Sequence, residues 1–262
     1  MTKNKKIAIL IVAYNAAKTI SHVLDRIPES VKEMVEEIFV FDNASPDKTH
    51  LVVEEWKTKT GTEKLTVFRN STNRGYGGNQ KLGYNYAIKK GYDIVVMLHS
   101  DGQYAPEMLP EILAPLINDQ ADAVFGSRML VKGAARRGGM PLYKYIGNKV
   151  LTTFENLATG ARLSEWHSGY RAYSIKSLLQ VNFNENTDDY HFDSEIIIQF
   201  ADRGLKIVEI SIPTYYGDEI CYVNGMKYAA LIFKSVCEYL LHKVGLRYYV
   251  KFGENKNSKK VD

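Results

Sequence analysis

Residues 95–103 read Val95-Val96-Met97-Leu98-His99-Ser100-Asp101-Gly102-Gln103, and they join the pattern of a buried strand to a polar end. The four leading apolar residues predict a short strand that is covered on both faces. The side chains of His99, Asp101 and Gln103 follow it and can bind a cation. Because open α/β sheets bind ligands at the carboxyl ends of their strands, a site is favoured here. A bare Asp-Gly turn is the alternative interpretation.

Strands and helices are predicted to alternate through the first half of the chain. Apolar, β-rich runs predict strands at residues 7–13, 37–41, 65–69, 93–98 and 121–125. Helical spacing of apolar residues predicts helices between them, at residues 17–27, 46–59, 80–90 and 106–117. This alternation is typical of βαβ units. We therefore expect an α/β fold with a Rossmann-like, mostly parallel sheet flanked by helices.

The second half of the chain is less regular. Its expected elements are a mobile basic loop at 131–145, helices at 143–157 and 192–203, and strands at 166–173 and 205–212. Residues 224–244 predict a C-terminal amphipathic helix. Packing of this helix against the body of the protein is favoured, and docking on a membrane or partner is the alternative. The expected organisation is a main domain at 1–220, a helical extension at 221–252 and a disordered tail at 253–262.

Composition places the chain among ordinary globular proteins. Of its 262 residues, 45% are hydrophobic and 24% are charged, and the formal net charge of +4 is too small to indicate a nucleic-acid partner. A mildly basic chain also suits an anionic substrate or membrane surface. The number and spacing of Cys221 and Cys237 indicate neither a disulfide framework nor a zinc site. Since no run reaches the ~18 apolar residues of a membrane span, we expect a cytoplasmic protein, either free or peripheral on the cytoplasmic membrane face.

Polar side chains follow nearly every predicted strand of the first half. In chain order they are Asn15, Asp42, Arg74, Asp101 and Arg128. The carboxyl ends of parallel strands meet at one edge of a sheet, so these residues are expected to converge there. Such convergence predicts an enzyme, and it favours a functional role for Asp101 over a bare turn.

The ordered set of strand-end segments resembles the family 2 glycosyltransferases, which have the GT-A fold. The segments that carry the resemblance are Ala13-Tyr14-Asn15, Phe41-Asp42-Asn43-Ala44-Ser45-Pro46-Asp47, Asn73-Arg74-Gly75-Tyr76-Gly77-Gly78-Asn79, His99-Ser100-Asp101-Gly102-Gln103 and Gly126-Ser127-Arg128. Two later segments, Ser168-Gly169-Tyr170-Arg171 and Glu209-Ile210-Ser211-Ile212-Pro213, are similar to dolichol-phosphate mannose synthases and bacterial polyprenyl-phosphate glycosyltransferases. The motifs are more specific for the family than for this subgroup.

The resemblance implies that a nucleotide-sugar, with UDP or GDP, binds at the strand ends. The residues implied to bind it are Ala13, Tyr14, Asn15, Asp42, Arg74, Gly78, Ser100 and Asp101. A carboxylate such as Asp42 can accept hydrogen bonds from a base N–H or a ribose hydroxyl. Its alternative role is to cap a helix before Pro46. Gly78 belongs to a glycine-rich loop, in which backbone N–H groups can bind oxygen ligands.

The resemblance also implies a divalent cation, Mg²⁺ or Mn²⁺, that neutralises the leaving nucleoside diphosphate. Asp101 and Gln103 supply the hard oxygen ligands that these ions prefer. His99, the third candidate metal ligand, stands where the family's Asp-x-Asp motif has its first aspartate, and histidine suits Mn²⁺ better than Mg²⁺. Two arrangements stay open. Either Asp101 and the diphosphate hold most of the cation, or His99 contacts the nucleotide.

The implied acceptor is a polyprenyl or dolichyl phosphate, and the implied enzyme inverts the sugar's configuration. Asp101 and Arg128 are the implied catalytic residues. The acceptor is implied to contact Arg128, Arg136, Ser168 and Arg171, since guanidinium groups match phosphate bidentately. A sugar hydroxyl in surface polysaccharide synthesis is the alternative acceptor, and it requires a general base. The candidate bases are Asp188, Asp189, Asp193 and Glu195. A non-catalytic nucleotide-binding protein on this fold is the third interpretation.

Overall fold

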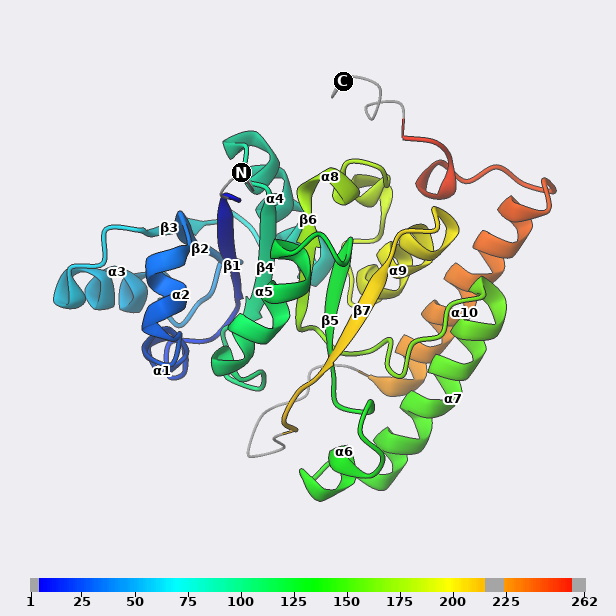
Figure 1. Cartoon of the computed structure of the whole chain (residues 1–262), viewed down its shortest axis with the longest axis horizontal. Coiled ribbons are helices and arrows are strands. Elements are labelled where there is room, and N and C mark those ends of the chain that lie inside the picture. Colours follow the sequence, from blue (N-terminus) through cyan, green and yellow to red (C-terminus); the bar gives the residue numbers. More distant parts are fainter. Residues whose placement is uncertain (1–4, 215–223, 256–262) are drawn as a thin grey trace.

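The computed structural model describes residues 5–214 and 224–255, and a seven-stranded sheet runs through its centre (Figure 1). The strands are β1 (Ile7–Ala13), β2 (Glu37–Asp42), β3 (Leu65–Arg69), β4 (Ile94–His99), β5 (Ala123–Ser127), β6 (Arg171–Ser174) and β7 (Ile207–Ser211). Their spatial order is β3-β2-β1-β4-β6-β5-β7. All neighbours are parallel except β6, which is antiparallel to β4 and β5. The predicted mostly parallel α/β sheet is confirmed.

Helices cover both faces of this sheet. They are α1 (Ile20–Asp25), α2 (Glu29–Met34), α3 (Thr49–Thr60), α4 (Gly75–Lys90), α5 (Leu109–Ile117), α6 (Ala134–Arg137), α7 (Leu142–Thr159), α8 (Ile175–Leu178), α9 (Phe192–Asp202) and α10 (Gly225–Lys243), with 3₁₀ turns η1 (Pro106–Met108), η2 (Phe183–Glu185) and η3 (Val250–Phe252). The prediction of one loop over residues 131–145 is wrong, because α6 and the start of α7 lie within it. Ala135 of α6 is buried against Met129 and Met140, which anchors the short helix.

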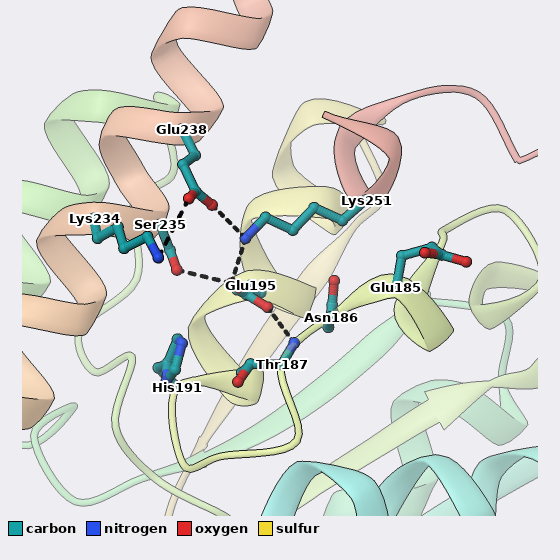
Figure 2. A pocket seen from close by; sticks show the side chains of 9 residues that line it. All are labelled: Glu185, Asn186, Thr187, His191, Glu195, Lys234, Ser235, Glu238 and Lys251. Carbon is teal, nitrogen blue, oxygen red and sulfur yellow. Dashed lines mark hydrogen bonds and ion pairs between the residues drawn. The ribbon is translucent and has the colours of Figure 1, made fainter. Parts of the chain in front are cut away.

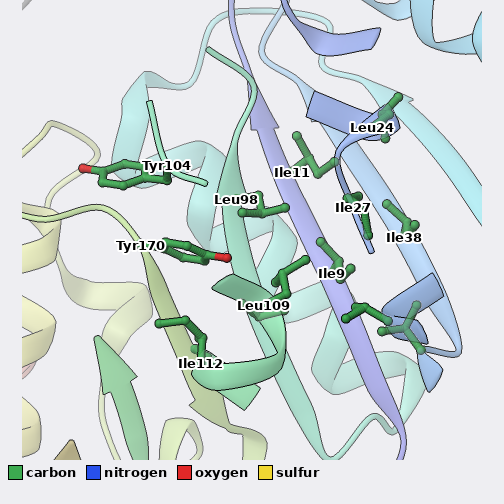
Figure 3. Packing of buried hydrophobic residues seen from close by; sticks show 14 of the residues in the cluster. Ile9, Ile11, Leu24, Ile27, Ile38, Leu98, Tyr104, Leu109, Ile112 and Tyr170 are labelled. Atoms are coloured by element: carbon green, nitrogen blue, oxygen red, sulfur yellow. The ribbon is translucent and has the colours of Figure 1, made fainter. Parts of the chain in front are cut away.

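Each central strand faces two apolar cores, and this explains its uninterrupted hydrophobic sequence. In β1, Ile9 and Ile11 enter the core beneath α1, α2, α3 and α5 (Figure 3), whereas Leu10 enters the core beneath α4, α8 and α9. All seven residues of β1 are buried. Side chains alternate along a strand, so a parallel strand with helices on both faces must be apolar at every position. Each fully buried side chain of this size contributes about 1.5–3 kcal/mol.

The C-terminal helix α10 packs against the body of the protein. Ile232, Val236 and Tyr239 are buried in the core that also contains α9, and α10 contacts both α9 and α7. Phe233 stacks on Phe154 of α7, with ring centroids 5.5 Å apart. The buried apolar side chains of the predicted amphipathic helix therefore pack against the body of the protein, which was the favoured alternative. Within residues 5–214 and 224–255, none of the helices has both the length and the apolar content that membrane crossing requires.

The chain after α10 returns to the body through η3. Asn255 donates hydrogen bonds to the backbone oxygens of Leu179 and Val181, at 2.9 and 3.0 Å. The first residues of the expected tail, up to Asn255, are thus attached to the protein. The rest of that tail, the expected domain boundary at 220 and Cys221 lie outside the described residues.

Candidate active site

The carboxyl ends of β2, β1 and β4 lie side by side at one edge of the sheet. Ala13 pairs in register with Asp42, and Val12 pairs with His99. Asp101 lies two residues beyond His99, in the turn that follows β4. The two carboxylates that the sequence singled out therefore flank the end of β1, as expected for parallel strands.

The turn after β4 presents Asp101 at the surface. Its Oδ1 accepts a hydrogen bond from the Gln103 backbone N–H at 3.0 Å, and Gly102 adopts the left-handed conformation with φ of +78°. Thr19 anchors the turn by donating to the Ser100 carbonyl at 2.7 Å. Ser100 itself is buried. The turn interpretation and the site interpretation are therefore compatible, because the turn holds Asp101 and Gln103 at the strand end with the Asp101 side chain exposed.

These residues fit a divalent cation only in part. Asp101 and Gln103 offer carboxylate and amide oxygens, which suit Mg²⁺ or Mn²⁺. Among the described residues, no group of three or more His, Cys, Asp and Glu side chains could hold a metal ion. The described side chains therefore supply at most part of the ligands that a cation at this strand end would have.

Asp42 is completely buried at the end of β2. Its Oδ1 accepts a hydrogen bond from the Ser45 N–H at 3.1 Å, while Oδ2 lies 3.3 Å from His50 Nδ1 and 3.9 Å from Arg69 Nε without a hydrogen bond. The side chain that binds the start of α3 is instead Asp47, which accepts bonds from the Thr49 N–H and hydroxyl at 3.1 and 2.6 Å. Asp42 thus keeps unused acceptor capacity beneath His50 and Arg69.

The end of β1 is ordered by the loop after β2. Asn15 adopts a left-handed conformation with φ of 53°, and its backbone N–H donates to Ser45 Oγ at 3.0 Å. Ala13 is buried, whereas Tyr14 is 43% exposed. An aromatic ring exposed beside Asp42 is suited to stacking on a planar base.

The glycine-rich segment differs from the expected phosphate-binding loop. Residues 75–78 form the first turn of α4, and the N–H groups of Gly77 and Gly78 donate to the Asp188 carbonyl at 2.8 and 3.3 Å. A Cβ on Gly77 would lie 2.5 Å from the Thr187 oxygen. These glycines therefore permit close packing between α4 and the segment before α9. Gly78 does not offer an open amide to a nucleotide-sugar, while Arg74 remains exposed at the N-cap of α4.

We predict that Gly77→Ala destabilises the protein by about 1–3 kcal/mol, because the new methyl group meets a backbone oxygen and the Phe192 Cβ at 2.5 and 2.7 Å. Gly147→Ala in α7 is the matched control, since a Cβ added there would have nothing within 4 Å. Alanine in that helix should be neutral or stabilising by up to about 1 kcal/mol. Urea unfolding of both variants measures the difference, and equal stabilities would contradict the packing role.

A network of asparagines fixes the loop between β3 and α4, and the sequence pattern alone assigned it no role. The Asn43 Oδ1 accepts bonds from the Arg74 N–H at 2.8 Å and from Asn70 Nδ2 at 3.0 Å. The Asn43 Nδ2 donates to Asn73 Oδ1 at 2.9 Å, and Asn79 donates to the Phe41 carbonyl at 2.9 Å. Asn43, Asn73 and Asn79 all stand in strand-end motifs, so their presence there was the available signal.

Arg128 lies after β5 and is bound by a buried carboxylate. Its backbone N–H donates to Glu165 Oε2 at 2.7 Å, and its Nε donates to Oε1 at 3.0 Å. Asn148 of α7 donates to the same Oε1 at 2.8 Å. Burial alone raises the pKa of Glu165, but the Arg128 charge and these hydrogen bonds outweigh it and lower the pKa. The guanidinium is therefore held in one place with its charge largely balanced, and 12% of its side-chain surface is exposed.

Two other residues implied to bind the acceptor are buried. Arg171 is 1% exposed, lies 3.7 Å from Asp193 Oδ2 and packs on the Phe125 ring at 4.7 Å. Ser168 is 2% exposed and accepts a bond from the Tyr170 N–H. Both side chains lie beneath the surface of the site, and neither exposes enough area to contact an acceptor. Arg136 is exposed on α6, where its guanidinium donates to the Met140 carbonyl.

Two of the four candidate bases are also committed to the interior. Asp193 accepts bonds from Tyr76 at 3.0 Å and from Gln80 at 3.1 Å. Glu195 accepts bonds from Thr187, Ser235 and Lys251 at 2.7, 2.8 and 2.6 Å, in a pocket of about 260 Å³ between α9, α10 and η3 (Figure 2). Through these bonds Glu195 of α9 connects α10 and η3 to the body of the protein. Asp188 and Asp189 remain near the surface, and Asp188 pairs with Lys81 at 2.8 Å.

The fold and the sequence together define the class of protein. The mostly parallel sheet with flanking helices is that of the GT-A fold. The chain belongs to glycosyl transferase family 2, whose sequence pattern matches residues 8–179. The predicted family and enzyme class are confirmed.

Similar proteins support this assignment over most of the chain. A UDP-N-acetylglucosamine–dolichyl-phosphate N-acetylglucosaminyltransferase of Methanococcus voltae is 29% identical over 81% of this chain and 87% of its own. An undecaprenyl-phosphate mannosyltransferase of Micrococcus luteus is 27% identical over 79% of this chain and 82% of its own. The solved glucosyl-3-phosphoglycerate synthase of Mycobacterium tuberculosis, in complex with UDP, shares the fold with a TM-score of 0.66 at 19% identity, covering 90% of this chain and 80% of its own.

Proposed function

We propose that this protein transfers a sugar from a nucleotide-sugar to a polyprenyl phosphate with inversion of configuration. A phosphate oxygen of the acceptor attacks the anomeric carbon, the bond from that carbon to the diphosphate breaks, and the nucleoside diphosphate leaves. An acceptor phosphate is already anionic, so no general base is needed. The observation that carries this proposal is that Asp193 and Glu195, two of the four candidate bases, are buried and already accept hydrogen bonds, while a third, Asp188, is paired with Lys81. The named activities of the similar dolichyl- and undecaprenyl-phosphate enzymes agree with it.

The nucleotide-sugar would bind across the ends of β2, β1 and β4. Tyr14 offers a ring for the base. Asp42 is covered by His50 and Arg69, so its Oδ2 would accept a bond from a base N–H or a ribose hydroxyl once these two side chains move aside. Asp101 and Gln103 would hold Mg²⁺ or Mn²⁺, which supplies charge neutralisation for the leaving diphosphate. Arg128 would face the phosphates from the β5 side, oriented by Glu165.

A lipid acceptor would be delivered by the face that α6 and α7 present beside the strand ends. Helix α6 follows the carboxyl end of β5 and continues into α7 (Figure 1). The α7 side chains at least half exposed near its start are Leu142, Tyr143, Ile146 and Val150. Tyr143, Ile146 and Val150 lie on one side of the helix because they are three and four residues apart. The basic side chains nearby are Lys132, Arg136, Arg137, Lys144 and Lys149. An apolar stripe with basic flanks suits the surface of an anionic membrane.

The acceptor test uses the full chain with UDP- and GDP-sugars and three acceptors: polyprenyl phosphate in anionic vesicles, a short prenyl phosphate in solution, and a free oligosaccharide. We expect sugar transfer to both phosphates and not to the oligosaccharide. Tyr143→Glu/Ile146→Glu should slow transfer on vesicles at least about tenfold, since each apolar side chain withdrawn from lipid forfeits about 1.5–3 kcal/mol. Its transfer to the short phosphate in solution should stay unchanged.

Leu51→Glu on α3 is the matched control, because Leu51 is 51% exposed and α3 packs on the opposite face of the sheet from α7. It should behave like the unchanged protein with all three acceptors. Transfer to the oligosaccharide alone would replace the proposal with hydroxyl chemistry and direct attention to Asp188 and Asp189. Nucleotide binding without any turnover would favour a non-catalytic protein.

A further inference from the structure

A chain of hydrogen bonds connects His99 at the end of β4 to the buried interior. The Nε2 atom of His99 lies 3.1 Å from the Tyr76 hydroxyl, and that hydroxyl lies 3.0 Å from Asp193 Oδ2. Asp193 Oδ1 accepts a bond from Gln80 Nε2 at 3.1 Å, and Arg171 Nε lies 3.7 Å from Asp193 Oδ2. Four elements, α4, β4, β6 and α9, thus meet around one ring.

Counting the protons in this chain determines which nitrogen of His99 carries hydrogen. The Asp193 carboxylate is paired with the buried Arg171 and can only accept. Tyr76 has a single proton, and Oδ2 of Asp193 has no other hydrogen bond among the described residues, so the tyrosine proton is donated there. The Tyr76 oxygen must then accept from His99, which places the proton of a neutral imidazole on Nε2. The second nitrogen, Nδ1, keeps its lone pair and makes no hydrogen bond to the described residues.

The surroundings hold the ring in this orientation. Tyr104 and Tyr76 stand edge-on to His99, with ring centroids 5.0 and 5.6 Å away. Gly169 passes so close that an added Cβ would lie 2.5 Å from His99 Nε2, and its N–H donates to the Tyr104 hydroxyl at 2.7 Å. A second layer that fixes one imidazole nitrogen is the arrangement by which proteins aim the other nitrogen at a ligand.

We propose that the Tyr76–Asp193 pair locks His99 as the Nε2–H tautomer, so that Nδ1 serves as a nitrogen ligand to the divalent cation that Asp101 and the diphosphate hold. This inference rests on the proposed function for the presence of the cation, but not for the tautomer. A nitrogen ligand where a carboxylate is usual removes one negative charge from the site and favours Mn²⁺ over Mg²⁺. Tyr76 is a positioning residue in this scheme, because it acts on the cation only through His99.

The tautomer is tested on the metal-free protein by ¹⁵N NMR of the imidazole rings, with His99→Asn identifying the His99 signals. We expect a protonated Nε2 and an unprotonated Nδ1 above neutral pH. In Tyr76→Phe the preference for Nε2–H should weaken, because the acceptor of that proton is gone. A signal from an Nδ1–H tautomer in the unchanged protein would overturn the proposal, and this outcome does not depend on any enzymatic activity.

The ligand role is tested by electron paramagnetic resonance of Mn²⁺ bound together with UDP or GDP. A ¹⁴N coupling to Mn²⁺ is expected in the unchanged protein and should be absent in His99→Asp. The ratio of Mg²⁺ to Mn²⁺ dissociation constants should fall about tenfold or more in His99→Asp, and Tyr76→Phe should weaken Mn²⁺ binding by about 10- to 100-fold. Mn²⁺ binding without nitrogen coupling would overturn the role of His99 alone. Failure of Mn²⁺ to bind with either nucleotide would overturn the ligand role and the proposed function together, while the tautomer result would stand.

Discussion

Asp101→Asn is expected to lower kcat/KM for sugar transfer by about 10²- to 10³-fold while leaving the protein folded. Asparagine keeps the size of the side chain and an oxygen that can accept the Gln103 N–H bond, so the turn after β4 should persist. It removes the only negative charge in residues 95–103. A divalent cation held through one carboxylate loses most of its attraction when that charge is removed, and the leaving diphosphate then carries its charge uncompensated.

The measurement is transfer of a labelled sugar to polyprenyl phosphate over a range of Mn²⁺ and Mg²⁺ concentrations. Asp119→Asn is the matched control, because Asp119 is exposed, pairs only with Lys5 among the described residues and lies at the opposite end of α5 from the site. Its rate should equal that of the unchanged protein. If Asp101→Asn also retained full activity at every metal concentration, Asp101 would have no role in catalysis, and the turn interpretation would be correct.

The central strands could be predicted from the sequence because local pattern and burial agree in them. Residues of β1 and β4 are apolar at every position up to the strand end since helices cover both faces, and a parallel sheet brings the ends of such strands together. For β6 the sequence predicted a strand over residues 166–173, but no apolar run fixed its bounds, and the strand covers Arg171–Ser174. It has four residues, runs antiparallel between β4 and β5, and is placed by contacts with residues far away in the chain.

The same distinction holds for the site residues: some positions follow from the local sequence pattern, and others depend on partners that are distant in the chain. Asp42 and Asp101 could be located because each directly follows a recognisable strand. The partners of other site residues are far away in sequence: Gly77 meets Asp188, and Arg128 meets Glu165. A glycine-rich segment before a helix indicates phosphate binding or close packing equally well, and only the position of the 187–188 backbone decides for packing. An ion pair between residues as far apart in the chain as Arg128 and Glu165 cannot be predicted from the spacing of residues in a single sequence.

Arg171 is the residue for which the structure changes the interpretation most. Arginine is almost never fully buried unless it is paired, so an arginine in a motif is normally expected at the surface. Here Asp193 compensates it. Burial alone lowers the pKa of Arg171, but the neighbouring carboxylate outweighs burial and raises the pKa. The guanidinium is therefore charged at every accessible pH, and its Nη2 also donates to the Trp166 carbonyl at 2.8 Å.

Arg171→Met is expected to destabilise the protein by about 3–5 kcal/mol, because it leaves the Asp193 carboxylate buried without its cation. Asp193→Asn should cost a similar amount, and the double variant should be less destabilised than the sum of the two, since neither charge is then left alone. Urea unfolding at neutral pH measures all three. A surface arginine that binds the acceptor would behave in the opposite way: its loss would raise KM for polyprenyl phosphate and leave stability within about 0.5 kcal/mol. Stability and KM together therefore separate the supporting role from the binding role. A supporting role also connects this ion pair to His99, because the same Asp193 oxygen that faces Arg171 accepts the Tyr76 proton.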